Sequence, residues 1–442
     1  MSESARRHRV KLAFGWKHAL GHAADEDKDF GFGRDQRTYA KVGGSASAPI
    51  AQAAMADFDD SGWASVQIPH DWAIDLPYDP GSAAPADGQD DPRAAHGYKA
   101  LGRDHPENSV GWYRRKLAIP ADWSGRRLGL TFDGAFRSVI VFLNGVIVAE
   151  HAGGYTPFDV DITDIARPGE VNWLVVRVDA SLGEGWFYEG AGLYRHVWMT
   201  ATDPLHVAPY GAFIQAAPHG AGATGKVEVA LRNQSDTPRQ ARVRMTVLAP
   251  NGLAMARTER LVAVDAWSEG RSEADLAWDA APLWSPADPQ LHRLSVEVEL
   301  DGVVRDAVDV PFGVRSAVFD PRRGFLLNGQ PLKLLGACCH QDHAGVGAAL
   351  PDALQVWRIQ QLKAMGCNAY RAAHNPATPE LMDACDRLGM LVIAETRRMS
   401  SDPESLEELS TLVRRDRNRP SVIAWSIGNE EQTIQGLSLI HI

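Results

Sequence analysis

Residues 420–430 read PSVIAWSIGNE and decide the fold of the C-terminal part of the chain. An apolar, β-branched run stops there abruptly at Gly428, Asn429 and Glu430. This pattern is typical of a buried parallel strand that ends in polar residues at the carboxyl edge of its sheet. In a (β/α)8 barrel the catalytic groups lie at that edge. We therefore interpret Glu430 as a proton donor, with a solvent-facing glutamate at a strand end as the alternative.

Strand and helix patterns alternate from Arg315 onward. The expected strands are 333–337, 368–371, 390–394 and 422–427, and the expected helices are 352–365, 379–388 and 403–417. Gly366 and Gly389 follow two of these helices, as helix stops do. Repeated βα units predict a parallel sheet with right-handed crossovers. Residues 316–436 are thus expected to hold the first half of a (β/α)8 TIM barrel, strands 1 to 4.

The preceding residues show the period-two alternation of antiparallel β-structure. Residues 1–204 contain short alternating runs between turn residues, and Asn144-Gly145 between two apolar runs predicts a two-residue hairpin. This spacing predicts an N-terminal jelly-roll β-sandwich. Residues 205–315 alternate in the same way, and their length suits an immunoglobulin-like β-sandwich. The fold class is therefore multidomain, β plus α/β.

Composition places the chain among ordinary globular proteins. Of its 442 residues, 45% are hydrophobic and 23% are charged, and the formal net charge is −11. A negative chain is a poor partner for nucleic acid or an anionic membrane, and no apolar run is long enough to span a bilayer. The basic N-terminus lacks the apolar core of a secretory signal. The four cysteines form no secreted-type framework, so we expect a cytoplasmic protein with reduced thiols.

Motifs along most of the chain resemble glycoside hydrolase family 2, the β-galactosidase and β-glucuronidase family. Those similar to its N-terminal sugar-binding domain are IPHDWAIDLPYD (68–79), GWYRRKLAIP (111–120), residues 130–163 and GAGLYRHVW (190–198). Those similar to its barrel are RGFLLNGQPLKLLGACCHQDH (323–343), residues 365–396 and the acid/base signature RDRNRPSVIAWSIGNE (415–430). The resemblance implies a retaining exo-glycosidase. The motifs of this chain are more similar to those of bacterial β-galactosidases than to those of β-mannosidases.

The resemblance also implies roles for single residues. Glu430 would be the general acid/base, which protonates the glycosidic oxygen and then activates water. Asn429 would contact the sugar 2-hydroxyl. His340 and His374 match histidines that line the sugar pocket, each with a satisfied polar cap at a strand end as its alternative. Glu395 matches a carboxylate of the pocket floor.

Three further features have two interpretations each. Arg371 either braces its strand end with a carboxylate or contacts substrate. Asn108 either reaches the sugar from the N-terminal domain or is an ordinary loop residue before a strand. The aromatic run 186–188 forms a wall beside the pocket or part of an apolar core. Glu431 is interpreted as a solvated charge.

No metal site is expected, and no cofactor is assigned. The pattern CCHQDH (338–343) lacks the spacing of a zinc site. Some β-galactosidases of the family hold magnesium through a Glu and a His that follow the position of Glu395. Here Arg397 and Arg398 follow instead, so the resemblance does not extend to that magnesium site.

The family's nucleophilic Glu comes from the seventh barrel strand, and no residue of 1–442 can be assigned to it. The last six residues, LSLIHI (437–442), back-translate naturally as CTG TCT CTT ATA CAC ATC, the transposon end ligated into many sequencing libraries. We expect these six residues to be an adapter artefact and residues 1–442 to be inactive. Residues 1–315 are expected to fold better, because a half barrel leaves open strand edges.

Three functions follow from these patterns. The first is an exo-β-galactosidase that removes terminal non-reducing β-D-galactose from β-galactosides, with a homo-oligomeric full-length enzyme left open. The second is a β-glucuronidase of the same family, which needs cationic recognition of the sugar carboxylate. The third is a non-catalytic carbohydrate-binding protein. That third function requires a natural stop near residue 315, and the expected barrel strands argue against it.

Overall fold

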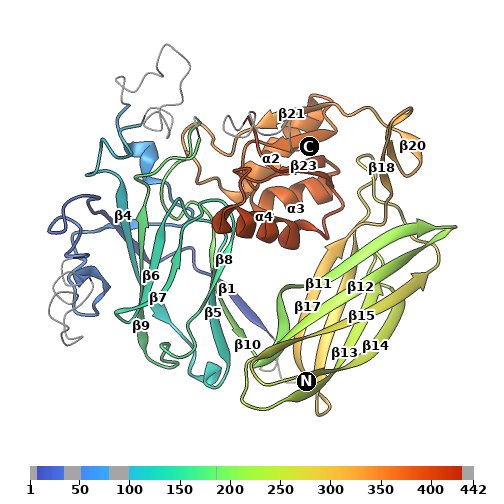
Figure 1. The fold of residues 1–442 in the computed structure, drawn as a ribbon, viewed down its shortest axis with the longest axis horizontal. Coiled ribbons are helices and arrows are strands. Elements are labelled where there is room, and N and C mark those ends of the chain that lie inside the picture. The colour runs from blue at the N-terminus through green and yellow to red at the C-terminus, as the bar shows by residue number, and fades with distance from the viewer. Residues whose placement is uncertain (1–6, 34–50, 79–98, 186, 431–442) are drawn as a thin grey trace. The chain divides into compact units, whose positions relative to one another are not determined.

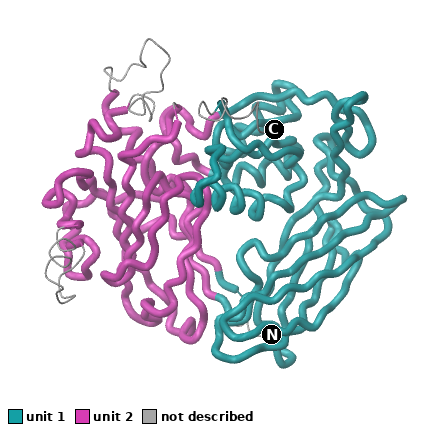
Figure 2. The backbone as a smooth tube through the Cα atoms, viewed as in Figure 1, with its two compact units in different colours: residues 1–8, 202–339, 352–442 teal, residues 9–201, 340–351 magenta. Residues whose placement is uncertain are grey.

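The structure is a computed structural model that describes residues 7–33, 51–78, 99–185 and 187–430. It divides into two compact units (Figure 2). Unit 1 comprises residues 1–8, 202–339 and 352–442, and unit 2 comprises residues 9–201 and 340–351. Among the described helices, none has the length and apolar character needed to cross a membrane. Predictions about Trp186, Glu431 and residues 437–442 fall outside the described residues.

Unit 2 is an antiparallel β-sandwich, as expected for a jelly roll (Figure 1). Its strands are β1 (His8–Lys11), β2 (Trp16–Leu20), β3 (Ala64–Val66), β4 (Val110–Ala118), β5 (Arg127–Phe132), β6 (Val139–Leu143), β7 (Val146–His151), β8 (Phe158–Asp161), β9 (Val171–Asp179) and β10 (Val197–Thr202). One sheet has the order β1-β10-β5-β8, and the other has the order β3-β2-β4-β9-β6-β7. Short 3-10 helices connect some of them: η2 (Gln52–Ala54), η3 (Trp72–Asp75) and η6 (Ala121–Trp123).

Alternating side chains build the core of this sandwich. Along β5 every second residue is buried, and these residues pack with aromatic side chains such as Trp16 and Tyr155. The predicted hairpin joins β6 to β7, where Leu143 pairs with Val146. Asn144 and Gly145 both adopt positive φ, at 53° and 84°, which is the backbone geometry that a two-residue hairpin turn requires.

Unit 1 begins with an immunoglobulin-like sandwich. Its strands are β11 (Leu205–His219), β12 (Gly222–Asn233), β13 (Arg239–Leu248), β14 (Ala254–Val264), β15 (Ser268–Trp278), β16 (His292–Leu300) and β17 (Val303–Phe312). The sheets have the orders β11-β12-β15 and β14-β13-β16-β17. Their inward faces are rich in buried valine, as the period-two alternation predicted.

A parallel sheet follows in unit 1, after a small antiparallel sheet formed by β18 (Ala317–Asp320), β19 (Gly324–Leu327) and β20 (Gln330–Pro331). The parallel strands are β21 (Gly336–Cys339), β22 (Ala369–Ala372), β23 (Leu391–Glu395) and β24 (Val422–Ser426), paired in that order. The first strand was predicted from Lys333, and the structure corrects this to Gly336. The side chain of Asn368 donates to the Lys333 carbonyl and accepts from the Leu335 amide, and the Leu335 carbonyl accepts from the backbone amides of Asn368 and Ala369. These residues therefore bond to the start of β22 before the regular pairing of β21 begins at Gly336.

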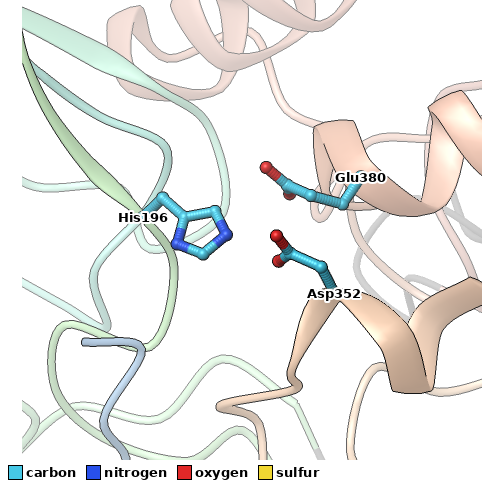
Figure 3. Close-up of side chains that lie close together, drawn as sticks. All are labelled: His196, Asp352 and Glu380. Atoms are coloured by element: carbon cyan, nitrogen blue, oxygen red, sulfur yellow. The ribbon is translucent and has the colours of Figure 1, made fainter. Parts of the chain in front are cut away.

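The helices between the parallel strands are α2 (Asp352–Ala364), α3 (Pro379–Leu388) and α4 (Pro403–Asp416). Thr378 and Asp402 cap α3 and α4, and a proline opens each helix, as helix N-termini favour. Acidic residues occupy the first turns, where the helix dipole favours negative charge. Two of them, Asp352 and Glu380, have carboxylate oxygens within 4.8 Å of each other (Figure 3).

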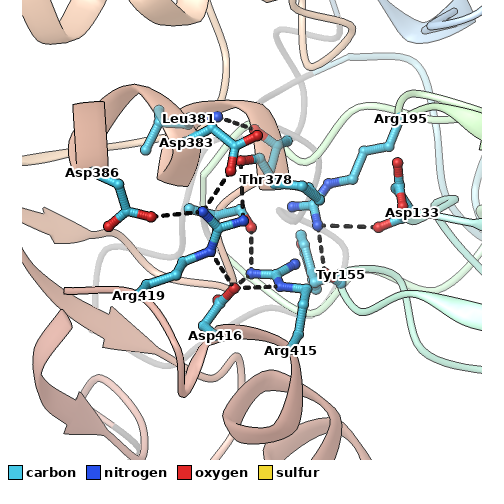
Figure 4. A network of polar contacts seen from close by, with 12 residues as sticks. Asp133, Tyr155, Arg195, Thr378, Leu381, Asp383, Asp386, Arg415, Asp416 and Arg419 are labelled. Carbon is cyan, nitrogen blue, oxygen red and sulfur yellow. Dashed lines mark hydrogen bonds and ion pairs between the residues drawn. The ribbon is translucent and has the colours of Figure 1, made fainter. Parts of the chain in front are cut away.

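An ion-pair network fastens the amino-terminal end of β24 to α3 and α4 (Figure 4). Arg419 donates to Asp383 at 2.6 Å, to Asp386 at 2.9 Å and to Asp416 at 2.9 Å. Arg415 also donates to Asp416, at 2.9 Å from Nε. Burial alone would raise the pKa of Asp416, but the two arginines outweigh it and hold that pKa below its ordinary value. The charge-rich RDRNR stretch before the strand is therefore structural.

The same end of the parallel sheet packs on residues of the immunoglobulin-like segment. Trp284 is fully buried in a cluster with Leu391 of β23, and its indole Nε1 donates to the Asp386 carbonyl at 2.9 Å. Arg315 donates to the carbonyls of Pro420 and Val422, which flank the start of β24. The parallel sheet thus shares one of its two apolar clusters with the sandwich that precedes it.

Candidate active site

Residues 422–430 form β24 and the turn after it. The strand ends at Ser426, and Asn429 and Glu430 follow at its carboxyl edge, as the pattern predicted. Asn429 is buried, whereas Glu430 is exposed. The backbone of Glu430 has φ of 49°, in the left-handed region that a non-glycine residue seldom adopts. Left-handed residues of this kind are found at turns and at functional sites.

Glu395 is the centre of a hydrogen-bonded cluster at this edge. It ends β23, its side chain is fully buried, and it accepts hydrogen bonds from three partners. Arg371 donates from Nε at 2.7 Å, and Ser426 donates from its hydroxyl at 2.8 Å. His374 Nδ1 lies 2.7 Å from the other carboxylate oxygen. The two strands that flank β23, together with the loop after β22, therefore supply side chains to one carboxylate.

Arg371 connects this carboxylate to the residue before the proposed acid. Its Nη2 donates to the side-chain oxygen of Asn429 at 3.0 Å. Burial works against the Arg371 charge, but the Glu395 carboxylate outweighs it, so the pKa of Arg371 is raised. With its carbonyl oxygen bonded to Arg371, Asn429 has its amide NH2 group left to donate to a ligand hydroxyl.

The two carboxylates of this edge have different surroundings. Glu395 is buried and takes three hydrogen bonds, which suits a fixed anion that orients its neighbours. Glu430 is exposed after the end of β24, so solvent has access to it. A general acid must come within hydrogen-bond reach of the atom that it protonates, so Glu430 is the better placed of the two.

Two predicted site residues are described within unit 2. The His340 ring lies against Phe187, with ring centroids 4.9 Å apart. Asn108 is half-buried, and its side-chain amide donates to the Ala100 carbonyl at 2.9 Å. That bond is what the loop interpretation of Asn108 predicts, and its contact with sugar stays a prediction. Phe187 is buried, and the Tyr188 hydroxyl donates to Asp71, so these two aromatic residues pack and bond within unit 2.

Sequence reasoning missed Ser426 as a partner of Glu395. Its signal was a single hydroxyl in an otherwise apolar strand, next to a strand that ends in glutamate. The register pairs Ser426 with Glu395, which brings the hydroxyl to the carboxylate. Sequence reasoning also missed Asp71 as the partner of Tyr188. The only signal for it in the sequence is its place within the motif IPHDW.

Asp352 and Glu380 raise the question of a metal (Figure 3). Both belong to unit 1, and the third side chain drawn with them, His196, belongs to unit 2. Protein zinc sites take three or four protein ligands. Two carboxylates at helix N-termini are explained by the helix dipole, and we assign no metal to them.

Three family models match the chain. Residues 100–203 match "Glycosyl hydrolases family 2, sugar binding domain", residues 211–315 match "Glycosyl hydrolases family 2", and residues 320–402 and 398–440 match "Glycosyl hydrolases family 2, TIM barrel domain". Each model covers one of the folds described above: the jelly roll, the immunoglobulin-like sandwich and the parallel sheet.

Curated relatives and a solved structure agree with these matches. The chain is 33% identical to β-galactosidase BoGH2A of Bacteroides ovatus over 86% of its own length and 44% of that protein. It is 30% identical to a β-glucuronidase of Bacteroides fragilis over 73% of its own length and 50% of that protein. A crystal structure of a family 2 member from Bacteroides cellulosilyticus superposes with a TM-score of 0.79 at 32% identity, over 96% of this chain and 53% of the other. The chain thus spans about half the length of the relatives that it matches.

Proposed function

Because the chain belongs to glycosyl hydrolase family 2, we propose that its complete gene product is a retaining exo-glycosidase that removes terminal β-D-galactose from β-galactosides. One observation carries this proposal. The exposed Glu430 follows a buried Asn429 at the carboxyl edge of a parallel sheet, and Asn429 is held by Arg371. This arrangement supplies an acid for a glycosidic oxygen beside an amide for a sugar hydroxyl.

The proposed reaction has two steps. In the first, a nucleophilic carboxylate attacks the anomeric carbon while Glu430 gives its proton to the departing glycosidic oxygen. In the second, Glu430 takes a proton from water, and that water replaces the enzyme carboxylate at the anomeric carbon. The family resemblance assigns the nucleophile to a later barrel strand than those described. Glu395 is not proposed for that role, because Arg371 and Ser426 already bond to its carboxylate.

Support for galactose as the sugar comes from the relatives. The β-galactosidase BoGH2A is 33% identical to this chain and is matched over 86% of it. The β-glucuronidases of Bacteroides fragilis, Paenibacillus borealis and Canis lupus familiaris are 30%, 29% and 29% identical to this chain, over 73%, 75% and 75% of it. A putative β-glucuronidase of Formosa agariphila is 28% identical over 85% of the chain. These same relatives make β-glucuronide hydrolysis the second candidate, since several of the curated relatives matched are β-glucuronidases.

The test uses the complete gene product with p-nitrophenyl β-D-galactoside and the matching glucuronide. We expect a higher kcat/KM for the galactoside and initial release of the β-anomer, observed by NMR. Initial release of the α-anomer would reject the two-step mechanism. A higher kcat/KM for the glucuronide would replace the first candidate with the second, and hydrolysis of neither substrate would overturn the proposed function.

A further inference from the structure

Asp71 is a buried carboxylate in unit 2 that bonds to a distant part of the chain. Its side chain is 3% exposed. One carboxylate oxygen accepts from the amides of Ala73 at 3.0 Å and Ala191 at 2.9 Å. The other accepts from the Ala348 amide at 2.8 Å and from the Tyr188 hydroxyl at 2.8 Å. Burial raises the pKa of Asp71, and these donors, led by Ala348, offset part of the shift.

The second carboxylate oxygen of Asp71 is so closely packed that a side chain larger than hydrogen cannot fit at two neighbouring positions. Gly347 has φ of 60°, and a Cβ added there would lie 2.3 Å from the Asp71 oxygen and 2.7 Å from the Tyr188 hydroxyl. A Cβ added to Gly190 would lie 2.6 Å from the same oxygen and 2.8 Å from the Ala348 Cβ. Both positions therefore need glycine, because the backbone there approaches the carboxylate closely. The segment 347–348 is seated on Asp71 by shape as well as by hydrogen bonds.

Residues 340–351 have a second attachment within unit 2. Gln341 accepts from Arg195 Nη2 at 3.3 Å and donates to the Glu189 carbonyl at 3.3 Å. Arg195 is itself fixed by the carbonyls of Tyr155, at 2.5 Å, and Asp133, at 3.4 Å (Figure 4). The segment is thus bonded near both of its ends, at Gln341 and at Ala348.

The turn between these attachments is bonded to itself. His343 and Gly347 exchange two backbone hydrogen bonds, at 2.9 and 3.0 Å. A short segment with two external attachments and a closed turn has little freedom to move independently. His340 is the first residue of this segment, and its ring rests on Phe187. Displacing Ala348 from Asp71 would therefore loosen the surroundings of His340.

We propose that Asp71 is a positioning residue that seats residues 340–351 on the jelly roll and thereby fixes His340 for contact with the sugar. The seating follows from the contacts above, whereas the role of His340 rests on the proposed function. Asp71 touches no reacting atom in this proposal. It acts through the amide of Ala348 and the hydroxyl of Tyr188.

Asp71→Asn is a selective variant for this proposal. Its remaining carbonyl oxygen can keep the bonds to Ala73 and Ala191, so the cap of η3 survives. Its NH2 group then faces the Ala348 N–H, and two donors cannot bond to each other. Asp29→Asn is the matched control. Asp29 is also buried in unit 2, but it accepts from Trp112 of β4 and Arg177 of β9.

The first measurement is hydrogen–deuterium exchange by mass spectrometry on the 442-residue chain. We expect Asp71→Asn to speed amide exchange in the peptide covering residues 340–351 at least tenfold. Asp29→Asn should leave that peptide within twofold of the wild type while it speeds exchange in β4 and β9. Unchanged exchange at 340–351 in Asp71→Asn, or equal acceleration in both variants, would overturn the seating by Asp71.

The second measurement is a double-mutant cycle in the complete gene product, with a β-galactoside as substrate. We expect Asp71→Asn to lower kcat/KM about tenfold in the wild-type background, chiefly through KM, and by less than twofold when His340→Ala is already present. Tyr188→Phe should give a smaller loss of the same kind. Equal losses in both backgrounds would show that Asp71 acts without His340 and would overturn the proposal.

The two proposals can fail separately. A gene product that hydrolyses neither galactoside nor glucuronide overturns the proposed function, and the exchange experiment then decides the seating of residues 340–351 by itself. An active gene product in which Asp71→Asn is kinetically silent overturns the positioning role and leaves the proposed function standing.

Discussion

The jelly roll of unit 2 and the parallel sheet of unit 1 build their cores in different ways. The jelly roll packs its own two sheets around large aromatic side chains, among them Trp16, Phe132 and Tyr155. The parallel sheet has one cluster with α2 and α3, and a second cluster that includes Trp284 from the preceding sandwich. An antiparallel sandwich can bury both inner faces against each other, whereas a short parallel sheet must be covered by other elements.

The difference extends to buried charges. In the jelly roll they fasten loops and strands, as when Arg114 pairs with Asp60 or Arg177 with Asp29. In the parallel sheet the buried charged residues form two groups, one at each end of the strands. The amino-terminal end holds the Arg419 network, and the carboxyl end holds the Glu395 cluster beside Glu430. Charges at the amino-terminal end thus fasten β24 to α3 and α4, whereas those at the carboxyl end bond Asn429, the residue before the exposed Glu430.

The largest effect should come from the carboxyl end. In the complete gene product, Glu430→Gln should slow hydrolysis of substrates with poor leaving groups by about 10²–10⁴-fold, the usual contribution of general acid catalysis. Activated aryl glycosides should lose much less, because their leaving groups need little protonation. Steady-state kinetics on the two substrate classes make the test, with the exposed Glu407→Gln of α4 as the control. Equal losses on both classes would remove Glu430 from the acid role.

A substitution at the amino-terminal end of the parallel sheet should lower the free energy of unfolding. Asp416→Asn leaves Arg415 buried without its carboxylate partner and weakens the bonding of Arg419. Breaking a buried ion pair in this way costs about 3–5 kcal/mol of unfolding free energy. Urea denaturation of the 442-residue chain, monitored at unit 1, measures the cost. The same Glu407→Gln control should change stability by less than about 0.5 kcal/mol. A loss for Asp416→Asn below about 1 kcal/mol would contradict the structural role of this network.

The jelly roll should be the acid-sensitive part of the comparison. Burial, helped by the neighbouring His70, lowers the pKa of His18 from 6.5 to about 3. The unfolded chain therefore binds a proton below pH 6.5 that the folded unit does not bind. The stability from neutral His18 is complete above that pH and falls as the pH drops toward 3. Between pH 7 and pH 5 the loss from His18 is about 2 kcal/mol.

Urea denaturation of unit 2 at both pH values measures this loss. His18→Phe keeps an aromatic ring in the cluster with Trp72 and Tyr113 but cannot be protonated, so it should remove the part of the pH dependence that His18 contributes. The part from His151, whose pKa burial lowers to about 4, should remain. His219→Gln, at an exposed position of β11, should leave the dependence of unit 2 unchanged. A pH dependence that is the same in His18→Phe and in the wild type would assign the acid sensitivity to other groups.

Local patterns predicted much of the fold. The sandwich character of both antiparallel segments follows from their alternation, and the Asn144-Gly145 hairpin and helix α3 from Pro379 to Leu388 lie where the turn residues and the Gly389 stop placed them. Each of these patterns depends only on residues that are close together in the sequence. The start of β21 was misplaced because it depends on Asn368, a side chain from a distant strand region.

The candidate site was predictable only in its residue types. A polar edge after β22, β23 and β24 followed from where the apolar runs stop, but the bonding of Arg371 to both Glu395 and Asn429 required the register. The seat of Ala348 on Asp71 joins residues that are 277 positions apart. No local pattern encodes such a pairing, because it depends on which unit residues 340–351 pack against.

The smallest effect tests whether the parallel sheet depends on the sandwich before it. Gly366 and Gly389 both have left-handed φ, at 91° and 73°, and follow α2 and α3. A Cβ at Gly366 would meet nothing within 4 Å, whereas a Cβ at Gly389 would lie 2.5 Å from the Pro286 carbonyl oxygen. Gly366→Ala should therefore cost only the backbone strain, about 1–2 kcal/mol.

Gly389→Ala should cost more than Gly366→Ala, because the backbone at Pro286 must also move. Lys363 donates to the Pro286 and Gly389 carbonyls at 2.9 and 3.2 Å, which holds the two segments together. Urea denaturation of the two variants isolates this contact, since the strain at the two glycines is nearly the same. Equal losses of unfolding free energy in the two variants would mean that the Pro286 backbone moves aside at little cost. The sandwich would then contribute little to the stability of the parallel sheet at this point. A larger loss for Gly389→Ala would show that the backbone at Pro286 resists displacement, so that the sandwich supports the parallel sheet at this point.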